Sequence, residues 1–224
     1  MKSVFYLYSP ISRYFRSRRI RQLYDLLNLK PTTRVLDVGG SWQFFWCYAA
    51  WLPQVTIMNL TEEAAGHGPI GHVIGDGRCM HFEDGAFDVV ISNSVIEHVG
   101  GWLEQEAFAN EVRRVGKAYY VQTPNRRFFL EPHVLTPFFQ FLPKPWQRAL
   151  VKHCTVRGLL DRLTPSECDD LTYGVRLLDR DELERLFPDA ELVGEYFCGA
   201  VKSWIAIRTD RASRTDRASR VTLR

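Results

Sequence analysis

Short apolar runs alternate with amphipathic stretches through most of the chain. Seven of these runs have the length and composition of β-strands, and they cover residues 35–38, 55–60, 72–75, 86–92, 117–123, 190–197 and 201–207. The run at 86–92 is almost continuously apolar, as in a strand that is covered on both faces. Strands that alternate with helices predict an α/β fold with a doubly wound, mostly parallel sheet of seven strands.

The longest predicted helix precedes the first strand and covers residues 11–29. Its apolar residues recur at i, i+3, i+4 and i+7, with arginines on the opposite side: Ile20, Leu23, Tyr24 and Leu27. We expect the apolar face to pack on the sheet or to cover a ligand site. A basic amphipathic helix is also compatible with peripheral contact with an anionic membrane surface.

Two further helices are predicted at 102–115, which ends at Gly116, and at 179–186, which begins near Asp179 or Asp181. The last two strands are joined by a short turn and predict an antiparallel C-terminal hairpin that closes the sheet. Residues 124–165 break the alternation because they are rich in proline and aromatic side chains, and we interpret them as an insertion.

The chain therefore divides into a basic helical segment at 1–30, an α/β domain at 31–207 and a tail at 208–224. The tail contains the hexapeptide Arg-Thr-Asp-Arg-Ala-Ser twice in succession. Its apolar content is too low to bury a core, so we expect the tail to be disordered.

Charge is unevenly distributed along the 224 residues, which carry a formal net charge of +3. The two ends, 1–30 and 208–224, contribute +6 and +4, which leaves −7 for residues 31–207. An acidic body with basic ends is not the pattern of a nucleic-acid-binding domain, which places a basic face on the fold itself. We therefore expect no nucleic-acid partner and interpret the basic ends mainly as solvated charge.

Hydrophobic residues make up 46% and charged residues 25% of the chain, as is typical of a soluble globular protein. No apolar run approaches the roughly 20 residues that span a bilayer. The five cysteines form no CxxC pair, which predicts reduced thiols and neither a disulfide framework nor a zinc site. We expect a cytoplasmic protein without a metal site, with peripheral contact at the inner membrane face as an option for the basic helix.

The most informative stretch is the first strand with the turn that follows it. Asp37 lies in this strand, Gly39 and Gly40 form the turn, and the second strand reaches Asn59, 22 residues after Asp37. In nucleotide-binding sheets a glycine turn lets backbone approach the ligand, and a polar residue roughly 20 positions later holds the ribose. The turn alone is a weak signal because it is not GxGxxG.

Two later segments carry a more specific resemblance. One runs from 75 to 99 and contains Gly-Asp-Gly-Arg and Ser-Asn-Ser-Val-Ile-Glu-His-Val; the other, at 122–133, reads Gln-Thr-Pro-Asn-Arg-Arg-Phe-Phe-Leu-Glu-Pro-His. Over roughly residues 33–207 the chain resembles the class I S-adenosylmethionine-dependent methyltransferases, in particular the bacterial type 11 group. The resemblance implies the Rossmann-like methyltransferase fold, with S-adenosylmethionine as cofactor and S-adenosylhomocysteine as product.

The resemblance implies a cofactor-binding role for eleven residues: Asp37, Gly39, Gly40, Ser41, Asn59, Leu60, Asp76, Gly77, Arg78, Asn93 and Ser94. It implies that Asp37 orients the turn and the methionine ammonium, and that the glycines let backbone amides approach the cofactor. Asn59, followed by Leu60, stands where the family usually has Asp or Glu for the ribose hydroxyls. Alternatively, Asp37 caps the next helix, and Ser41 either closes over the ligand or only belongs to the loop.

By the same resemblance, Asp76 accepts a hydrogen bond from the adenine amino group, with Gly77 and Arg78 as the adenine wall. Asn93 and Ser94 would then lie beside the methionine part and the methyl group. Asp76 and Gly77 together are also an ordinary turn dipeptide.

Methyl transfer from a sulfonium is an in-line displacement that mainly needs proximity and orientation, and a hydroxyl acceptor also needs a base. The candidate bases are His98, just past the fourth strand, and His133, in the insertion, where this fold commonly places substrate-binding elements. Alternatively, Glu97 and His98 fix the strand–helix junction, and His133 pairs with Glu131 to hold the insertion.

The insertion combines aromatic and basic side chains, which would suit an amphipathic or acidic acceptor such as a lipid-linked glycan, a phenol or an acidic sugar. The aromatic residues are equally what a small helical cap needs for its own core. We predict a methyltransferase acting on a small or lipid-linked metabolite, at oxygen. The alternative is a non-catalytic binding module with a degenerate turn. A nicotinamide-dependent oxidoreductase fits less well, because GxGxxG is absent.

Overall fold

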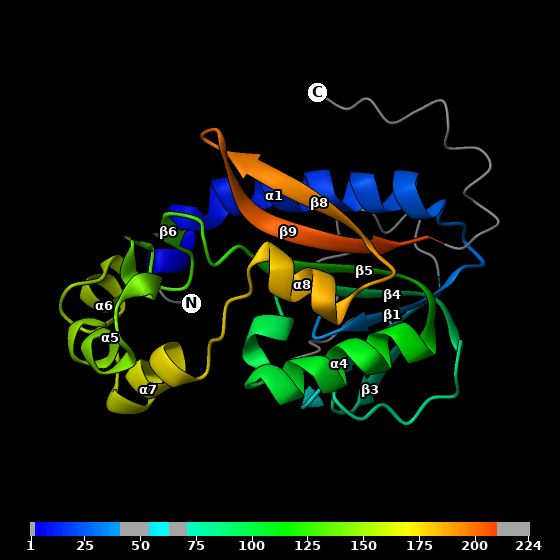
Figure 1. Ribbon diagram of the computed structural model, residues 1–224, viewed down its shortest axis with the longest axis horizontal. Helices are drawn as coiled ribbons and strands as arrows, with labels where there is room; N and C mark the ends of the chain where they lie inside the picture. The colour runs from blue at the N-terminus through cyan, green and yellow to red at the C-terminus, as the bar shows by residue number, and fades with distance from the viewer. Residues whose placement is uncertain (1–2, 41–53, 63–70, 210–224) are drawn as a thin grey trace.

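The computed structural model describes residues 3–40, 54–62 and 71–209. In these residues a seven-stranded sheet has the order β3-β2-β1-β4-β5-β9-β8 (Figure 1). Its strands are β1 (Arg34–Val38), β2 (Gln54–Asn59), β3 (Gly71–Ile74), β4 (Phe87–Asn93), β5 (Gly116–Pro124), β8 (Glu191–Phe197) and β9 (Ala200–Arg208). The first five strands are parallel, and β9 and β8 close the sheet as an antiparallel hairpin. The predicted fold class is confirmed.

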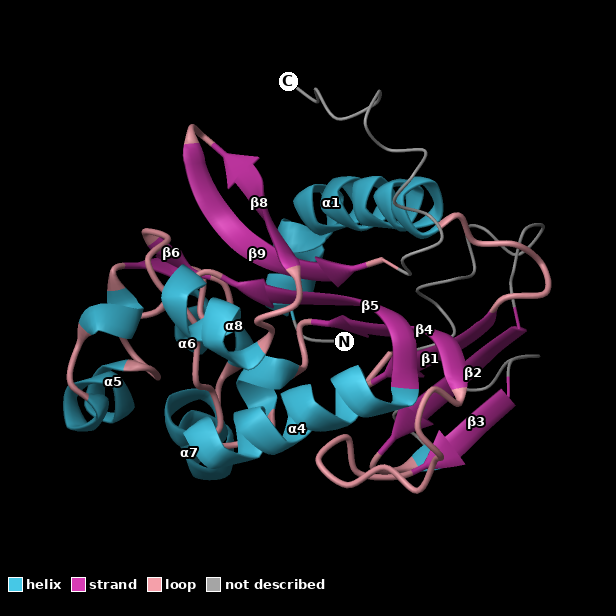
Figure 2. Ribbon diagram, turned by 45° about the vertical axis from the view of Figure 1, so that its right-hand side comes forward, coloured by secondary structure: helices cyan, strands magenta, loops and turns pink. Residues whose placement is uncertain are grey.

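Both faces of the sheet are covered by helices (Figure 2). The main ones are α1 (Ser3–Leu27), α4 (Trp102–Val115) and α8 (Arg180–Leu186). Alternate strand residues face opposite sides: Leu36 and Val90 pack in the core shared with α4 and α8, whereas Val35 and Val89 pack in the core shared with Leu23 of α1. Continuous apolar strands, such as β4, follow from this double burial.

The predicted helices are present with small differences at their ends. The first one starts at Ser3 rather than at residue 11, and its apolar face packs on the sheet. The helix predicted at 102–115 has these bounds. α8 begins after Asp179, whose side chain accepts from the Glu182 backbone in a capping box. No helix in the described part of the chain is both long and apolar enough to cross a membrane.

The insertion between β5 and α8 forms a separate lobe at the left of Figure 1. Its elements are β6 (Leu130–Glu131), β7 (Thr136–Pro137), η3 (Phe139–Phe141), α5 (Lys144–Leu150), α6 (Val156–Asp161) and α7 (Pro165–Tyr173). The lobe therefore continues past the predicted end at residue 165. Its small core contains Phe139 with aliphatic residues, whereas Phe138, Phe141 and Trp146 are exposed. Aromatic side chains thus serve only partly as the core of the lobe.

The C-terminal strand extends one residue into the repeat. Arg208 is the last residue of β9, and its guanidinium donates to the Asp189 carboxylate at 2.7 Å and lies over the ring of Tyr119. These contacts fix the first arginine of the repeat to the sheet. Residues 210–224, which include most of the tail that the sequence predicts to be disordered, lie outside the described residues.

Candidate active site

The candidate site lies at the carboxyl ends of the parallel strands, where the strand order reverses. β1 pairs with β2 on one side and with β4 on the other, so the segments after β1 and β4 leave in opposite directions. Such a switch point is where open α/β sheets bind ligands. We call the carboxyl ends of β1, β2, β3 and β4 the cofactor edge.

Asp37 of β1 is buried, and its Oδ2 atom has no hydrogen-bond partner within the described part of the chain. Burial raises the pKa of Asp37 to about 7. The carboxylate lies against Gly40, where an added Cβ would stand 1.6 Å from Oδ2. Gly39 has φ of +75°, and a Cβ there would meet the Val95 side chain at 2.6 Å. Both glycines are therefore required by the space and the backbone of this turn.

Asn59, at the end of β2, holds the same turn. Its Nδ2 donates to the carbonyl oxygen of Gly40 at 2.6 Å. A carboxylate at this position has no donor and would face that carbonyl with a second acceptor. The hydrogen bond to Gly40 thus gives a structural reason for an asparagine at this position, where the family usually has Asp or Glu. Leu60 beside it is 68% exposed, and Ser41 lies outside the described residues.

Asp76 and Arg78 form one compact pair after β3. The Asp76 carboxylate accepts from the backbone and the guanidinium of Arg78, and this hydrogen bonding lowers the pKa of Asp76. Gly77 packs on α4, because a Cβ there would stand 2.6 Å from the Phe108 ring. The loop is therefore fixed to the helix below it, while the Asp76 side chain stays partly exposed.

Asn93 and Ser94 end β4 and are held by partners from other elements. Oδ1 of Asn93 accepts from the Arg19 guanidinium of α1 at 2.7 Å. Ser94 has φ of +57°, an uncommon backbone conformation for a non-glycine residue. Its backbone N–H and its hydroxyl both donate to Gln122 of β5, each at 2.9 Å. These bonds hold the end of β4 in a defined position.

Arg19 was not predicted as a site residue. It makes two parallel hydrogen bonds to Glu195 of β8, at 2.7 and 2.8 Å, and the ion pair is buried. Burial alone would raise the pKa of Glu195, but Arg19 and Lys202 lower it to about 2. Because Glu195 is far from Arg19 in the sequence, no local pattern separates Arg19 from the solvated arginines around it.

Glu97, His98 and His133 converge next to the cofactor edge, and we call them the histidine cluster. The first two belong to η2 (Ile96–His98), directly after β4, and His133 follows β6 of the insertion. One ligand atom from each of the three lies within 4.8 Å of the others. The sequence-predicted candidates His98 and His133 are therefore brought together, with ring centroids 4.9 Å apart.

The surroundings of the two rings differ. Desolvation and the nearby His133 lower the pKa of His98 to about 4. Burial alone would lower the pKa of His133, but its Nδ1 lies 2.7 Å from Oε1 of Glu131, and the net effect raises that pKa. Burial raises the pKa of Glu97, whose Oε2 accepts from Thr123 at 3.0 Å. The expected Glu131–His133 pair is thus present together with a second, buried carboxyl group.

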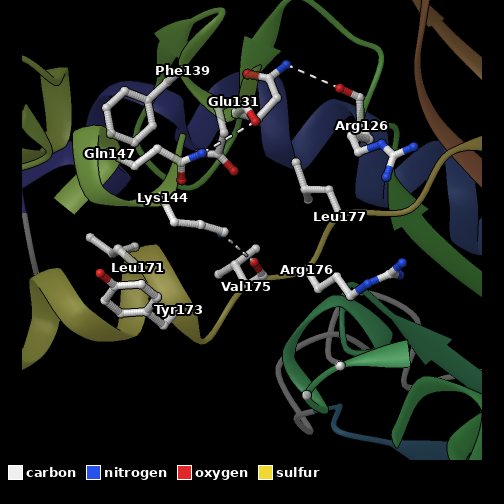
Figure 3. Close-up of a pocket in the computed structure, with 13 residues that line it drawn as sticks. Arg126, Glu131, Phe139, Lys144, Gln147, Leu171, Tyr173, Val175, Arg176 and Leu177 are labelled. Carbon is white, nitrogen blue, oxygen red and sulfur yellow. Dashed lines mark hydrogen bonds between the residues drawn. The ribbon is translucent and has the colours of Figure 1, made fainter. Parts of the chain in front are cut away.

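A pocket of about 490 Å³ adjoins the histidine cluster, and Glu131 lines it (Figure 3). Its basic residues differ in their partners. Arg126 donates to Asp179 at 2.5 Å, and Arg176 donates to Glu182 at 2.6 Å. The Lys144 ammonium instead donates to two carbonyl oxygens, of Thr172 and Val175. Apolar walls come from Phe139, Leu171 and Leu177.

Several solved structures share this fold. A SAM-dependent methyltransferase from Archaeoglobus fulgidus has a TM-score of 0.60 and 11% identity, over 92% of this chain and 98% of that chain. One from Methanosarcina mazei has a TM-score of 0.53 and 16% identity, over 80% of this chain and 92% of that chain. A protein from Pyrococcus horikoshii has a TM-score of 0.53 and 17% identity, over 86% of this chain and 89% of that chain. No curated protein sequence matches significantly.

The sequence itself matches a family model over residues 36–118, and this model is described as a methyltransferase domain. The chain therefore contains a methyltransferase domain at residues 36–118. The match spans β1 to β5 and includes the whole cofactor edge. It favours the methyltransferase over the nicotinamide-dependent oxidoreductase that the sequence also left open. The insertion, with His133 and most of the residues that line the pocket, lies outside the matched residues.

The cofactor edge of this methyltransferase fits S-adenosylmethionine on two observations. Asp37 Oδ2 is a buried acceptor without a partner among the described residues, which suits an ammonium group. At Gly40 the Asp37 carboxylate takes the space that a Cβ would fill, so only a glycine lets the backbone of the turn come this close to it. We therefore keep Asp37, Asn59 and Asp76 as the expected partners of the methionine, ribose and adenine parts.

Proposed function

We propose that this methyltransferase methylates a hydroxyl oxygen of a small or lipid-linked metabolite that carries an anionic group. The observation that carries the proposal is the pocket beside the histidine cluster. Lys144 reaches into this pocket, and its hydrogen bonds in the described part of the chain go to carbonyl oxygens, while the Glu131 carboxylate acts on it only through space. An anionic group of the acceptor would give this ammonium a counter-charge in direct contact.

The apolar walls of the pocket favour an acceptor that is also partly apolar. Phe139 and Leu177 line the same space as Lys144. Figure 3 shows the Lys144 chain extending across the pocket toward Val175, between these walls. Ligand pockets of this kind, mostly apolar with a few convergent polar groups, orient a ligand through the polar groups and bind it through its apolar part. Phenolic acids, acidic sugars and lipid-linked glycans with an acidic group all meet this description.

The histidine cluster supplies the chemistry that an oxygen acceptor needs. When bound, S-adenosylmethionine supplies a methyl group on a sulfonium sulfur. As the acceptor oxygen forms its bond to the methyl carbon, the carbon–sulfur bond breaks, and the hydroxyl proton has to leave. His98, Glu97 and His133 lie between the end of β4 and the pocket, where a hydroxyl proton would be accepted. An amine acceptor needs no such cluster when it arrives uncharged.

The proposal is tested with methyl-labelled S-adenosylmethionine and matched acceptors. A hydroxybenzoate and the corresponding aminobenzoate differ only in the acceptor atom, and a phenol without the carboxylate lacks the anionic group. A uronic acid with a neutral hexose, and acidic with neutral glycolipids, extend the comparison. We expect label on oxygen, with a preference for the anionic member of each pair. Label on nitrogen, or equal rates for anionic and neutral acceptors, would overturn the proposal.

Lys144→Met adds a second test of the same point. It should lower kcat/KM for an anionic acceptor by about 10- to 100-fold and leave the neutral analogue almost unchanged, since a lost charge contact of 1.4 kcal/mol is tenfold. Lys152→Met is the matched control, because Lys152 is exposed on the same lobe. Binding of S-adenosylhomocysteine should be equal in both variants, which shows that the cofactor edge is intact.

A further inference from the structure

Two imidazoles and one carboxylate meet in the histidine cluster, and this donor set occurs in many metal sites. Glu97, His98 and His133 each place one ligand atom within 4.8 Å of the other two. Two histidines with one carboxylate bind zinc in metalloproteases and ferrous iron in oxygenases. The four cysteines in the described part of the chain do not belong to this group. The sequence expectation of no metal site, which rested on cysteine spacing, therefore does not address this donor set.

The outer contacts of the two histidines are those of metal ligands. Nδ1 of His133 is bonded to Glu131 at 2.7 Å, which directs Nε2 away from that carboxylate. The second oxygen of Glu131 accepts from the Val134 backbone at 2.8 Å, so the carboxylate is itself fixed. The backbone of Gly174 interacts with the ring of His98. In metal sites a ligand histidine almost always donates its other ring N–H to a carboxylate or a carbonyl.

Glu97 gives an independent reason to expect a cation. Its side chain is fully buried, and one oxygen, Oε2, accepts from Thr123. The other oxygen, Oε1, has no hydrogen-bond partner within the residues that the structure describes. A buried carboxylate oxygen without a partner is costly unless an ion or a donor occupies the space next to it.

We propose that Glu97, His98 and His133 bind a divalent transition-metal ion, with Zn²⁺ as the first candidate. Glu97 is buried, His133 is half-buried and His98 is exposed, so solvent reaches the cluster. Three protein ligands would leave the fourth position of a tetrahedral ion open. The pocket adjoins the cluster through Glu131. With the ion in place, the three side chains would act as its ligands and not as the proton acceptor. The ion would bind the acceptor hydroxyl at the open position and lower its pKa, and the proton would leave to solvent. This last role rests on the proposed function; metal binding itself does not.

Metal binding is tested on the full chain after treatment with a chelator and removal of that chelator. Calorimetric titration with Zn²⁺ alone should show one ion per chain. His98→Gln should weaken binding by at least about 100-fold, and Glu131→Gln, which removes the negative charge next to His133, by 10- to 100-fold. His153→Gln is the matched control, because His153 is exposed on the insertion outside the cluster. Since His98 is exposed, its variant should fold, and circular dichroism checks this.

Co²⁺ as a probe identifies the ligands. Nitrogen and oxygen ligands give weak visible absorption, whereas binding through the exposed Cys79, Cys154 or Cys198 gives an intense thiolate charge-transfer band. A folded wild type that binds no stoichiometric Zn²⁺ would overturn the proposal, as would a thiolate band or equal binding by His98→Gln and His153→Gln. Such a result would indicate that a protonated His133 alone links Glu131 and Glu97.

The role of the ion is separated from the proposed function by measuring methyl transfer in metal-free and reloaded protein. A drop of at least tenfold on metal removal, restored by Zn²⁺, supports the role in acceptor binding. Metal binding with unchanged methyl transfer overturns that role. If methyl transfer to oxygen is absent in every sample, the proposed function fails, while the titration still decides whether the metal site exists.

Discussion

The cofactor edge and the pocket side of the active site are built in different ways. At the cofactor edge, Asp37, Gly40 and Asn59 lie within 23 residues of one another and meet through backbone turns at the ends of adjacent strands. On the pocket side, Glu97 lies within the residues that the family model matches, whereas His133 belongs to the insertion outside them. The comparison teaches that the fold determines the cofactor edge, whereas the insertion determines the pocket side and can change with the acceptor.

The largest expected effect tests whether the cofactor edge is built for binding at the expense of stability. Folding raises the pKa of Asp37 from 3.8 to about 7, so the folded chain keeps a proton that the unfolded chain loses. Stability from this group therefore falls as pH rises from about 4 to 7, and the full cost applies above pH 7. At one pKa unit per 1.36 kcal/mol, Asp37→Asn should stabilise the protein by about 4 kcal/mol at pH 8 and much less at pH 5.

Urea denaturation at the two pH values measures this difference, with Glu106→Gln on the exposed side of α4 as the control. The same Asp37→Asn variant should bind S-adenosylhomocysteine more weakly, because the ammonium loses its carboxylate partner. Wild-type affinity should in turn rise between pH 5.5 and 8 as Asp37 ionises. A variant that is less stable at pH 8 would contradict the burial argument, and unchanged affinity would remove Asp37 from the cofactor site.

The next effect tests the link between α1 and the cofactor edge. Arg19→Met removes two of the hydrogen bonds that the buried Glu195 accepts, and it leaves Asn93 without the donor from α1. Breaking a buried ion pair from one side typically costs 3–5 kcal/mol, and because Lys202 still contacts Glu195, we expect about 3 kcal/mol. Thermal or urea unfolding measures this loss, and Arg18→Met, on the exposed side of the same helix, is the matched control.

The double variant Arg19→Met with Glu195→Gln sharpens this test. Because it removes both charges of the pair, it should recover part of the lost stability, while Lys202 loses its carboxylate and Asn93 its donor. If Arg19 positions the end of β4 through Asn93, cofactor affinity should fall in Arg19→Met and should be equally low in the double variant. Recovery of both properties would show that Arg19 acts on stability alone.

The strands could be predicted from the sequence because a strand that is buried on both faces has a continuous apolar sequence. The ends of all seven strands lie within one residue of the predicted ends. The glycine turn was also readable, since it depends on neighbouring residues. Arg19 was not, because its partner Glu195 is 176 residues away. The pairing of Glu97 with His133 depends on how the insertion folds back, and no period or spacing records that path. His98 and His133 were therefore predicted separately, without the cluster that joins them.

The smallest expected effect tests whether Asn59 is needed to hold the glycine turn or to contact the ribose. A carboxylate would be the stronger partner for ribose hydroxyls, so resemblance to the family predicts that Asn59→Asp tightens cofactor binding. The structure predicts the opposite, because Nδ2 of Asn59 donates to the Gly40 carbonyl at 2.6 Å and an aspartate would repel that oxygen. We expect S-adenosylhomocysteine affinity to fall by about tenfold, or 1.4 kcal/mol. Calorimetric titration measures it, with Asn110→Asp on exposed α4 surface as the control. Tighter binding would mean that the turn keeps its shape without Asn59, and that ribose contact alone decides which residue this position needs.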